Sequence, residues 1–319
     1  MEFLQFLEAH RTPVLDRLFY LVTQLGSEVL FIVVGLALFW CVSKREGYYL
    51  LTVGFFGTIL SQFLKLFCQI PRPWVRDPSF TIVESARAGA AGYSFPSGHT
   101  QSAVGIYGSI ARWHRSWLLR GILIAAMALV AFSRMYLGVH TPADVAAGAL
   151  ISLVLVFGLY PLMRRVSEDN HIMTWIILAM LAVSTLYLLY VLLYPFPPAF
   201  DQENLTSGVK SAWTLFGALW GLLASYWADR RYIHFDTAAS PLAQLAKLVV
   251  GAGLLLLLKT LLKAPLLALC GGQLYADAIR YFLVVLFAAA VWPMTFPFWR
   301  KVFPGKPHKN QNAHKKGSP

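Results

Sequence analysis

The sequence predicts an all-α protein, a polytopic bundle of transmembrane helices. Of its 319 residues, 57% are hydrophobic and only 13% are charged, whereas about a quarter of the residues in soluble domains are charged. Long apolar segments recur along the whole chain, as expected of helices that cross a bilayer repeatedly. Lysine and arginine collect in the short connections and in the C-terminal tail. The net charge of +12 therefore indicates orientation in a membrane and contact with membrane lipids, with no nucleic acid as partner.

Residues 1–27 are expected to form an N-terminal amphipathic segment at the membrane interface. Charges are dispersed through "MEFLQFLEAHRTPVLDRLF", and no cleavage site of small residues follows. These features do not fit a signal peptide. They favour a helix that lies in the interface or is partly inserted.

Nine apolar segments follow as candidate spans, at 28–43, 48–68, 98–113, 119–138, 143–163, 172–194, 210–228, 242–264 and 276–297. The first and the third are short for a span of about 20 residues. The third is also polar, with Thr100, Gln101, Ser102 and Ser109 along it. We expect this helix to face protein or water instead of lipid.

Basic connections alternate with connections that carry little positive charge. Lysine and arginine mark 43–47, 112–120, 164–171, 229–240 and the tail 300–319, which the positive-inside rule places in the cytoplasm. The tail is expected to be a disordered basic extension that touches anionic lipid. The loops 69–97, 139–142, 195–209 and 265–275 then face the outside.

One outside stretch departs from this pattern of charge. Residues 65–87 carry four cations, Lys65, Arg72, Arg76 and Arg87, and only two opposing carboxylates. Because the positive-inside rule does not account for these cations, they require a local chemical reason.

One polar cluster opens this stretch, and a second follows it at residues 95–99. In "KLFCQIPRP", Pro71 and Pro73 make an unbroken helix unfavourable, so Arg72 is expected on a turned loop above Lys65. In "FPSGH", Ser97 is suited to cap a helix whose first turn holds Gly98 and His99. The free N–H groups of that turn would form a seat for an anion.

A third cluster, "SRMYLGVHTPAD", lies between two spans. Gly138 can end one helix, and Thr141-Pro142-Ala143-Asp144 can begin the next, with threonine as N-cap. His140 then stands just outside the helix start. Asp144 can accept a proton from one imidazole nitrogen and leave the other free as nucleophile or base.

Each residue has an ordinary explanation when it is taken alone. Lys65 could be a snorkelling lysine at a helix end, and Asp144 a common first-turn charge. These explanations do not account for two histidines, an aspartate and three cations at external helix ends of an otherwise apolar bundle. Ionisable groups at membrane depth indicate function.

The three clusters together resemble the signature of the type 2 phosphatidic acid phosphatase (PAP2) superfamily. That signature is K-x6-R-P, P-S-G-H and S-R-x5-H-x3-D, and it is filled here by Lys65…Arg72-Pro73, Pro96-Ser97-Gly98-His99 and Ser133-Arg134…His140…Asp144. Every fixed position is present. The resemblance covers residues 10–165.

The resemblance implies a metal-independent phosphatase that uses no cofactor and works through a phospho-histidine. Carried over, His140 attacks phosphorus, Asp144 orients it, and His99 gives a proton to the leaving alkoxide. The implied phosphate-binding residues are Lys65, Arg72, Ser97, Gly98 and Arg134. The outside loops hold no Asp/Glu cluster of metal-site type, and the spacing of the three cysteines fits neither a metal site nor a disulfide framework.

The resemblance also implies a domain organisation and a location. We expect a PAP2-type core at 28–165 and additional transmembrane helices at 166–299, as in the longer, nine-span branch with glucose-6-phosphatase-like topology. The substrate would be a lipid phosphate or pyrophosphate. The site would lie on the non-cytoplasmic face of a bacterial plasma membrane.

Three other functions share these residues. A sugar-phosphate phosphatase would use the same site on a soluble substrate, and a phosphotransferase would pass the phosphoryl group to an acceptor other than water. A lipid flippase, transporter or scaffold would only bind phosphate. His140 argues against this last class, because a binding protein does not need a histidine held by an aspartate beside a second histidine.

Overall fold

The computed structural model describes residues 1–167 and 170–304, which form helices joined by short connections and, in these ranges, no strand. The predicted all-α class is confirmed. Six segments are long and apolar enough to cross a membrane, and they contain α4 (Lys44–Cys68), α7 (Trp117–Tyr136), α8 (Pro142–Arg165), α9 (Ile172–Leu193), α11 (Pro241–Leu261) and α13 (Ala276–Leu286).

A seventh span forms if two consecutive helical segments count as one. These are α2 (Pro13–Thr23) with the 3-10 turn η1 (Gln24–Gly26), and α3 (Glu28–Ala37) with the π-helical turn η2 (Leu38–Val42). The two segments meet at a bend of 45°. The first predicted span therefore continues backward through a bend into residues that we expected at the interface.

The two remaining predicted spans, α6 (Gly98–Trp113) and α10 (Gln202–Ala228), are shorter or less apolar than these segments. α6 has only 16 residues and packs against α4, α7 and α8. Thr100, Gln101 and Ser109 are buried along it, which confirms that this helix faces protein. α10 packs against α4, α9 and α13. Helices shielded in this way need little apolar surface toward lipid.

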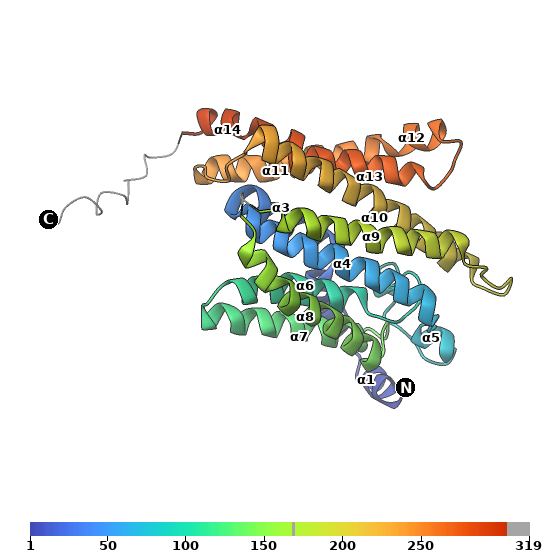
Figure 1. Cartoon of the computed structure of the whole chain (residues 1–319). Helices are drawn as coiled ribbons and strands as arrows, with labels where there is room; N and C mark the ends of the chain where they lie inside the picture. The colour runs from blue at the N-terminus through green and yellow to red at the C-terminus, as the bar shows by residue number, and fades with distance from the viewer. Residues whose placement is uncertain (168–169, 305–319) are drawn as a thin grey trace.

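The helices alternate in direction, so the connections gather at two ends of the bundle (Figure 1). The basic connections predicted to be cytoplasmic lie at one end. The opposite end holds the short helix α5 (Pro73–Arg76), the turn η3 (Glu84–Ala86), the start of α8 and of α10, and α12 (Lys263–Leu269). The three polar clusters therefore lie at one end of the molecule.

Most of the long helices have an N-cap residue. The side chain of this residue accepts a hydrogen bond from the backbone N–H three residues further on. The capping residues are Ser43, Ser97, Ser116, Thr141, Asp201 and Ser240. These caps fix where each helix starts. They thereby fix which residues stand at the ends of the bundle.

The N-terminal segment packs against the bundle. α1 (Glu2–Ala9) and α2 lie beside α7, and Leu4 is buried. Between the two helices, Arg11 donates hydrogen bonds to the carbonyls of Tyr136 (3.0 Å) and Thr81 (2.7 Å). The segment is therefore anchored to the connection that follows α7.

The C-terminal helices are joined to the rest of the bundle by buried polar contacts. Trp40 Nε1 donates to the carbonyl of Ala288 (2.8 Å), and Lys247 Nζ donates to the carbonyl of Trp40 (3.0 Å). Lys44 pairs with Asp229 (2.7 Å) in η4 (Asp229–Ile233). The chain then passes through η5 (Phe287–Val291), η6 (Pro293–Thr295) and α14 (Phe296–Val302). Most of the predicted disordered tail, 305–319, lies outside the described residues.

Candidate active site

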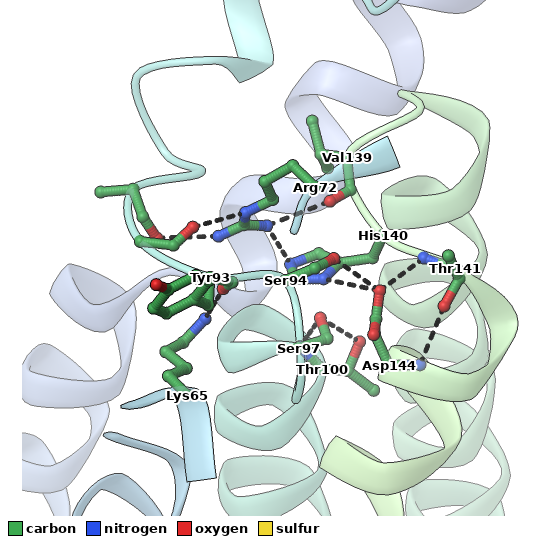
Figure 2. Close-up of polar contacts among 12 residues, drawn as sticks. Lys65, Arg72, Tyr93, Ser94, Ser97, Thr100, Val139, His140, Thr141 and Asp144 are labelled. Carbon is green, nitrogen blue, oxygen red and sulfur yellow. Dashed lines mark hydrogen bonds and ion pairs between the residues drawn. The ribbon is translucent and has the colours of Figure 1, made fainter. Parts of the chain in front are cut away.

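The three polar clusters come together at one end of the bundle (Figures 1 and 2). The first follows α4, the second begins α6, and the third connects α7 to α8. Because α6 packs on α4, α7 and α8, residues more than 70 positions apart in the chain surround one site.

The start of α6 is built as the sequence predicts. Ser97 Oγ accepts a hydrogen bond from the N–H of Thr100 (3.4 Å), so Ser97 is the N-cap. The N–H of Ser97 donates to the carbonyl of Asp144 (2.9 Å), which fixes this turn against α8. A Cβ on Gly98 would meet no atom within 4 Å. The first turn of α6 therefore has open space beside it.

The start of α8 also has the predicted form. α7 ends at Tyr136, and Gly138 adopts φ +80, a conformation that glycine favours. Thr141 and Asp144 form a capping box, in which each side chain accepts a hydrogen bond from the other residue's N–H. This turn holds His140 between the two helices.

The contacts of His140 define which of its nitrogens carries the proton. Arg72 Nη1 lies 2.9 Å from His140 Nε2. Because an arginine can only donate, Nε2 must present a lone pair, and the proton of the neutral imidazole is on Nδ1. His140 Nδ1 lies 3.6 Å from Asp144 Oδ2. This is the tautomer that the expected orientation by Asp144 requires.

The link between His140 and Asp144 is longer than we expected. At 3.6 Å it is an ion-pair distance, and Nδ1 has no hydrogen-bond partner among the described residues. Asp144 Oδ2 instead accepts hydrogen bonds from Ser94 Oγ (2.6 Å) and from the N–H of Thr141 (2.7 Å). The carboxylate is thus held in place beside the imidazole (Figure 2).

Arg72 ties the first cluster to the third. Its guanidinium donates to the carbonyls of Gly92 (2.9 Å), Ala91 (2.8 Å) and Val139 (3.0 Å), in addition to His140. Four hydrogen bonds use four of the five guanidinium N–H groups. Arg72 is therefore fixed in position by the backbone around the site (Figure 2).

Arg134 lies in the site with much of its hydrogen-bonding capacity unused. Its side chain is 1% exposed, and Nη1 donates to Thr23 Oγ1 (2.8 Å). Nε and Nη2 have no partner within the described chain. Buried N–H donors are almost always paired, so this arginine is suited to receive an anion.

Lys65 and His99 complete the site. Lys65 Nζ donates to the carbonyl of Tyr93 (2.6 Å), which leaves two of its three N–H groups. A Cβ on Gly89 would lie 3.5 Å from His99 Cε1, and one on Gly26 would lie 2.6 Å from the carbonyl oxygen of His99. Glycine at position 26 therefore allows η1 to approach the backbone of His99 closely, whereas a side chain at position 89 would only touch the imidazole.

The cations act together on His140. Its pKa lies well below the ordinary 6.5, first because of burial and then because of the charges of Arg72, Arg134 and Lys65, with His99 contributing least. Groups from all three clusters are thus within electrostatic reach of one imidazole, and together they favour its neutral form.

The outer cations of the charged loop do not join the site. Arg87 pairs with Glu84 (2.7 Å) on the surface, and Arg76 is exposed. Within the described ranges, no group of three or more His, Cys, Asp or Glu residues is placed to hold a metal ion.

The sequence analysis missed Thr23 and Ser94. Ser94 lies only three positions before Ser97, so its nearness to the second motif is a usable signal. Thr23 is 111 positions from Arg134, in a segment that we assigned to the interface, and no feature of the sequence connects the two.

Two family models match the chain, one over the helices that carry the site and one over the C-terminal helices. Residues 46–168, which include the whole site apart from Thr23, match the model of the PAP2 superfamily. Residues 213–300 match the model of a transmembrane extension of PAP2 superfamily phosphatases. The chain belongs to the PAP2 superfamily. It is thus an integral membrane protein and a phosphoric monoester hydrolase.

The relatives of this PAP2 protein are lipid phosphatases. It is 30% identical over 165 residues to phosphatidylglycerophosphatase B of Bacillus subtilis (46% of this chain, 74% of the relative). It is 29% identical over 153 residues to undecaprenyl-diphosphatase BcrC of the same species (47% and 75%). Mouse sphingosine-1-phosphate phosphatase 1 is 29% identical over 163 residues (48% and 36%). No solved structure matches the chain.

Proposed function

We propose that this PAP2 protein hydrolyses a lipid phosphate or lipid pyrophosphate through a phospho-histidine on His140, without a metal ion, at the non-cytoplasmic face of the membrane. The observation that carries the proposal is Arg134, a buried guanidinium whose Nε and Nη2 have no partner among the described residues. A phosphate placed there would lie among three cations, next to an imidazole whose Nε2 lone pair is held by a hydrogen bond from Arg72.

The chemistry follows from this arrangement. The phosphate oxygens are held by Arg134, Lys65 and the first turn of α6, which has open space at Gly98. Arg72 releases His140 Nε2 and turns that N–H toward the phosphate. The nitrogen then attacks phosphorus, and Asp144 stabilises the charge that develops on the imidazole.

The second half of the reaction needs an acid and then a base. His99 donates a proton to the leaving alkoxide as the P–O bond breaks. It then takes a proton from a water molecule that attacks the phospho-histidine and releases phosphate. Phosphoryl transfer depends mainly on positioning and charge neutralisation. Three fixed cations and a helix N-terminus are suited to supply both.

The lipid nature of the substrate is supported by the relatives. Phosphatidylglycerophosphatase B, undecaprenyl-diphosphatase and sphingosine-1-phosphate phosphatase are named for phosphorylated lipids. The site lies at the end of a bundle whose neighbouring helices α7 and α8 carry many exposed leucines, isoleucines and valines. An acyl chain could therefore remain in the bilayer while the head group reaches the site.

The test is phosphate release by the purified protein in detergent, with a chelator present. Dioctanoyl phosphatidic acid and farnesyl diphosphate represent the two substrate classes. We expect release to persist in the chelator, to vanish in His140→Ala, and to be accompanied in the wild type by an acid-labile phosphoenzyme. Unchanged release by His140→Ala would rule out the proposed nucleophile.

A leaving-group comparison tests His99. We expect His99→Asn to slow hydrolysis of an alkyl phosphate by about 10²- to 10⁴-fold. The same variant should retain far more activity on p-nitrophenyl phosphate, because nitrophenolate leaves without a proton. Equal losses on both substrates would show that His99 is not the acid.

A further inference from the structure

A cavity of about 90 Å³ lies directly beside the site. It is partly open to solvent and is lined by α4, by residues 91–93 and by the first turns of α10, which precede the part of the chain that matches the extension model. Its lining includes Gln62, Lys65, Tyr93, Asn204, Ser207 and Gly208. The cavity has room for several water molecules or for a small hydroxylated group.

Two of the lining residues have unused polar groups. Within the described residues, the amide of the half-buried Gln62 and the hydroxyl of the exposed Ser207 make no hydrogen bond. Gln62 lies one helical turn from Lys65 inside a membrane-spanning segment, where a polar side chain is costly unless it has a role. These groups supply both donors and acceptors to whatever enters the cavity.

Close packing brings α10 to this place. A Cβ on Gly208 would collide with Leu66 of α4. Tyr187 Oη donates to the carbonyl of Gly208 (3.0 Å) and holds this turn against α9. The cavity thus lies where α10 packs on α4, and this packing places Ser207 on the same side of the site as Lys65.

Lys65 belongs to both the site and the cavity. Only one of its three N–H groups is used by the carbonyl of Tyr93. Figure 2 shows Lys65 and Tyr93 on one side of His140 and Asp144 on the other. A phosphate held by Lys65 would therefore lie beside the cavity, so that a substituent of the leaving alcohol could extend into it while His99 protonates the departing oxygen.

We propose that this cavity binds the hydroxyl-bearing part of the leaving alcohol. The protein would then prefer phosphate monoesters of hydroxylated lipid alcohols over simple alkyl phosphates and isoprenyl diphosphates. The cavity is too small and too polar for an acyl chain, and the charge of Lys65 disfavours a cationic group. This inference rests on the proposed phosphatase function and adds a specificity site to it.

The test compares two substrates that differ by one hydroxyl. These are 1-lauroyl-glycerol 3-phosphate and the same compound without its 2-hydroxyl group. We expect the wild type to favour the hydroxylated compound about tenfold in kcat/KM, as one or two hydrogen bonds would give. Gln62→Leu and Ser207→Ala should each reduce this preference several-fold. Thr206→Val, an exposed neighbour of Ser207 on α10, is the control and should leave the preference intact.

The outcomes separate this inference from the proposed function. If the wild type hydrolyses both compounds equally, or if it favours farnesyl diphosphate, the inference is wrong while the phosphatase activity stands. A preference that survives in both variants would also overturn it, because the hydroxyl would then be recognised elsewhere. Failure to hydrolyse any of the three compounds would contradict the proposed function itself.

Discussion

At the scale of single residues, the site is prepared for an anion before one arrives. Arg72 is fixed by three backbone carbonyls and His140, whereas two buried nitrogens of Arg134 have no partner in the described part of the chain. The first arginine holds the imidazole of His140, the proposed nucleophile, and the second has capacity to bind an anion. Unpaired buried donors cost free energy, so a phosphate that pairs with Arg134 recovers that cost in binding.

The lowered pKa of His140 makes a prediction about pH. The ordinary pKa of an imidazole is 6.5, and the lowered pKa of His140 keeps it neutral below that pH. We therefore expect kcat/KM to be maintained in mildly acidic solution and to fall only at a more acidic pH, where His140 becomes protonated. Arg134 contributes to this lowering. Without this charge the pKa of His140 should rise. As the pH is lowered, the residual activity of Arg134→Gln should therefore begin to fall at a higher pH than that of the wild type.

The measurement is the pH dependence of kcat/KM for both proteins on one substrate. Ionisation of the substrate is the same in the two profiles, so the difference between them reports on the enzyme. An acidic limb that does not move, or moves to lower pH, would contradict the role of Arg134 as a neighbouring charge.

A second prediction concerns Thr23, which accepts a hydrogen bond from Arg134. Thr23→Val keeps the shape of the side chain but removes the acceptor. The loss of a hydrogen bond to a charged group costs about 1.5–3 kcal/mol, which corresponds to a decrease of about 10- to 150-fold in a rate or binding constant. We expect a loss of this order in kcat/KM, with full or nearly full rescue in Thr23→Ser, which retains the hydroxyl. Equal losses in both variants would point to packing instead.

At the scale of elements, the site depends on the contact between α6 and α8. A Cβ on Gly148 of α8 would lie 2.5 Å from the carbonyl oxygen of Ser97, the residue that caps α6. The two helices can approach this closely only with glycine at that position. The approach also allows the N–H of Ser97 to bond to the carbonyl of Asp144.

The same helix offers a matched pair of variants. Gly148→Ala must push α6 away from α8 and should lower stability by about 1–3 kcal/mol. It should also impair catalysis, because Ser97 and Asp144 would separate. Gly158→Ala, with no atom within 4 Å of the added Cβ, should be neutral or slightly stabilising. Thermal unfolding in detergent and phosphate release measure the two effects. Equal behaviour of the two variants would show that the close approach is unimportant.

At the scale of the whole molecule, the alternation of helices separates the basic connections from the site. The two lie at opposite ends of the bundle (Figure 1). If the positive-inside rule holds here, the site faces the non-cytoplasmic side of the membrane.

Cysteine labelling tests this orientation. Cys270 lies in the turn after α12, at the site end, and Arg115 is exposed in a connection at the other end. On a background in which the other cysteines are serine, a membrane-impermeant maleimide should label Cys270 in intact bacterial cells. In Arg115→Cys without Cys270, labelling should appear only after permeabilisation. The reverse pattern would place the site in the cytoplasm.

The sequence alone determined the class of fold, the ends of most helices and the motifs. Helix α6 begins and ends where it was predicted, and the caps at Ser97 and Thr141 are those expected. These features are local, since a cap or an apolar run depends on residues within a few positions. The three motifs also identified the superfamily. The spacing within each motif is set by a local turn of the chain, so it can be recognised without knowledge of the tertiary structure.

Only the tertiary structure decided which residues meet across long separations. The hydrogen bond from Arg134 to Thr23, the cavity between Gln62 and Ser207, and the shielding of α6 and α10 all depend on how helices pack. Nine spans stay a prediction: six or seven of the segments are long and apolar enough to cross a membrane by composition, and the other two, α6 and α10, pack among neighbouring helices. Packing is set by the shapes of many side chains at once, and no local pattern in the sequence records it.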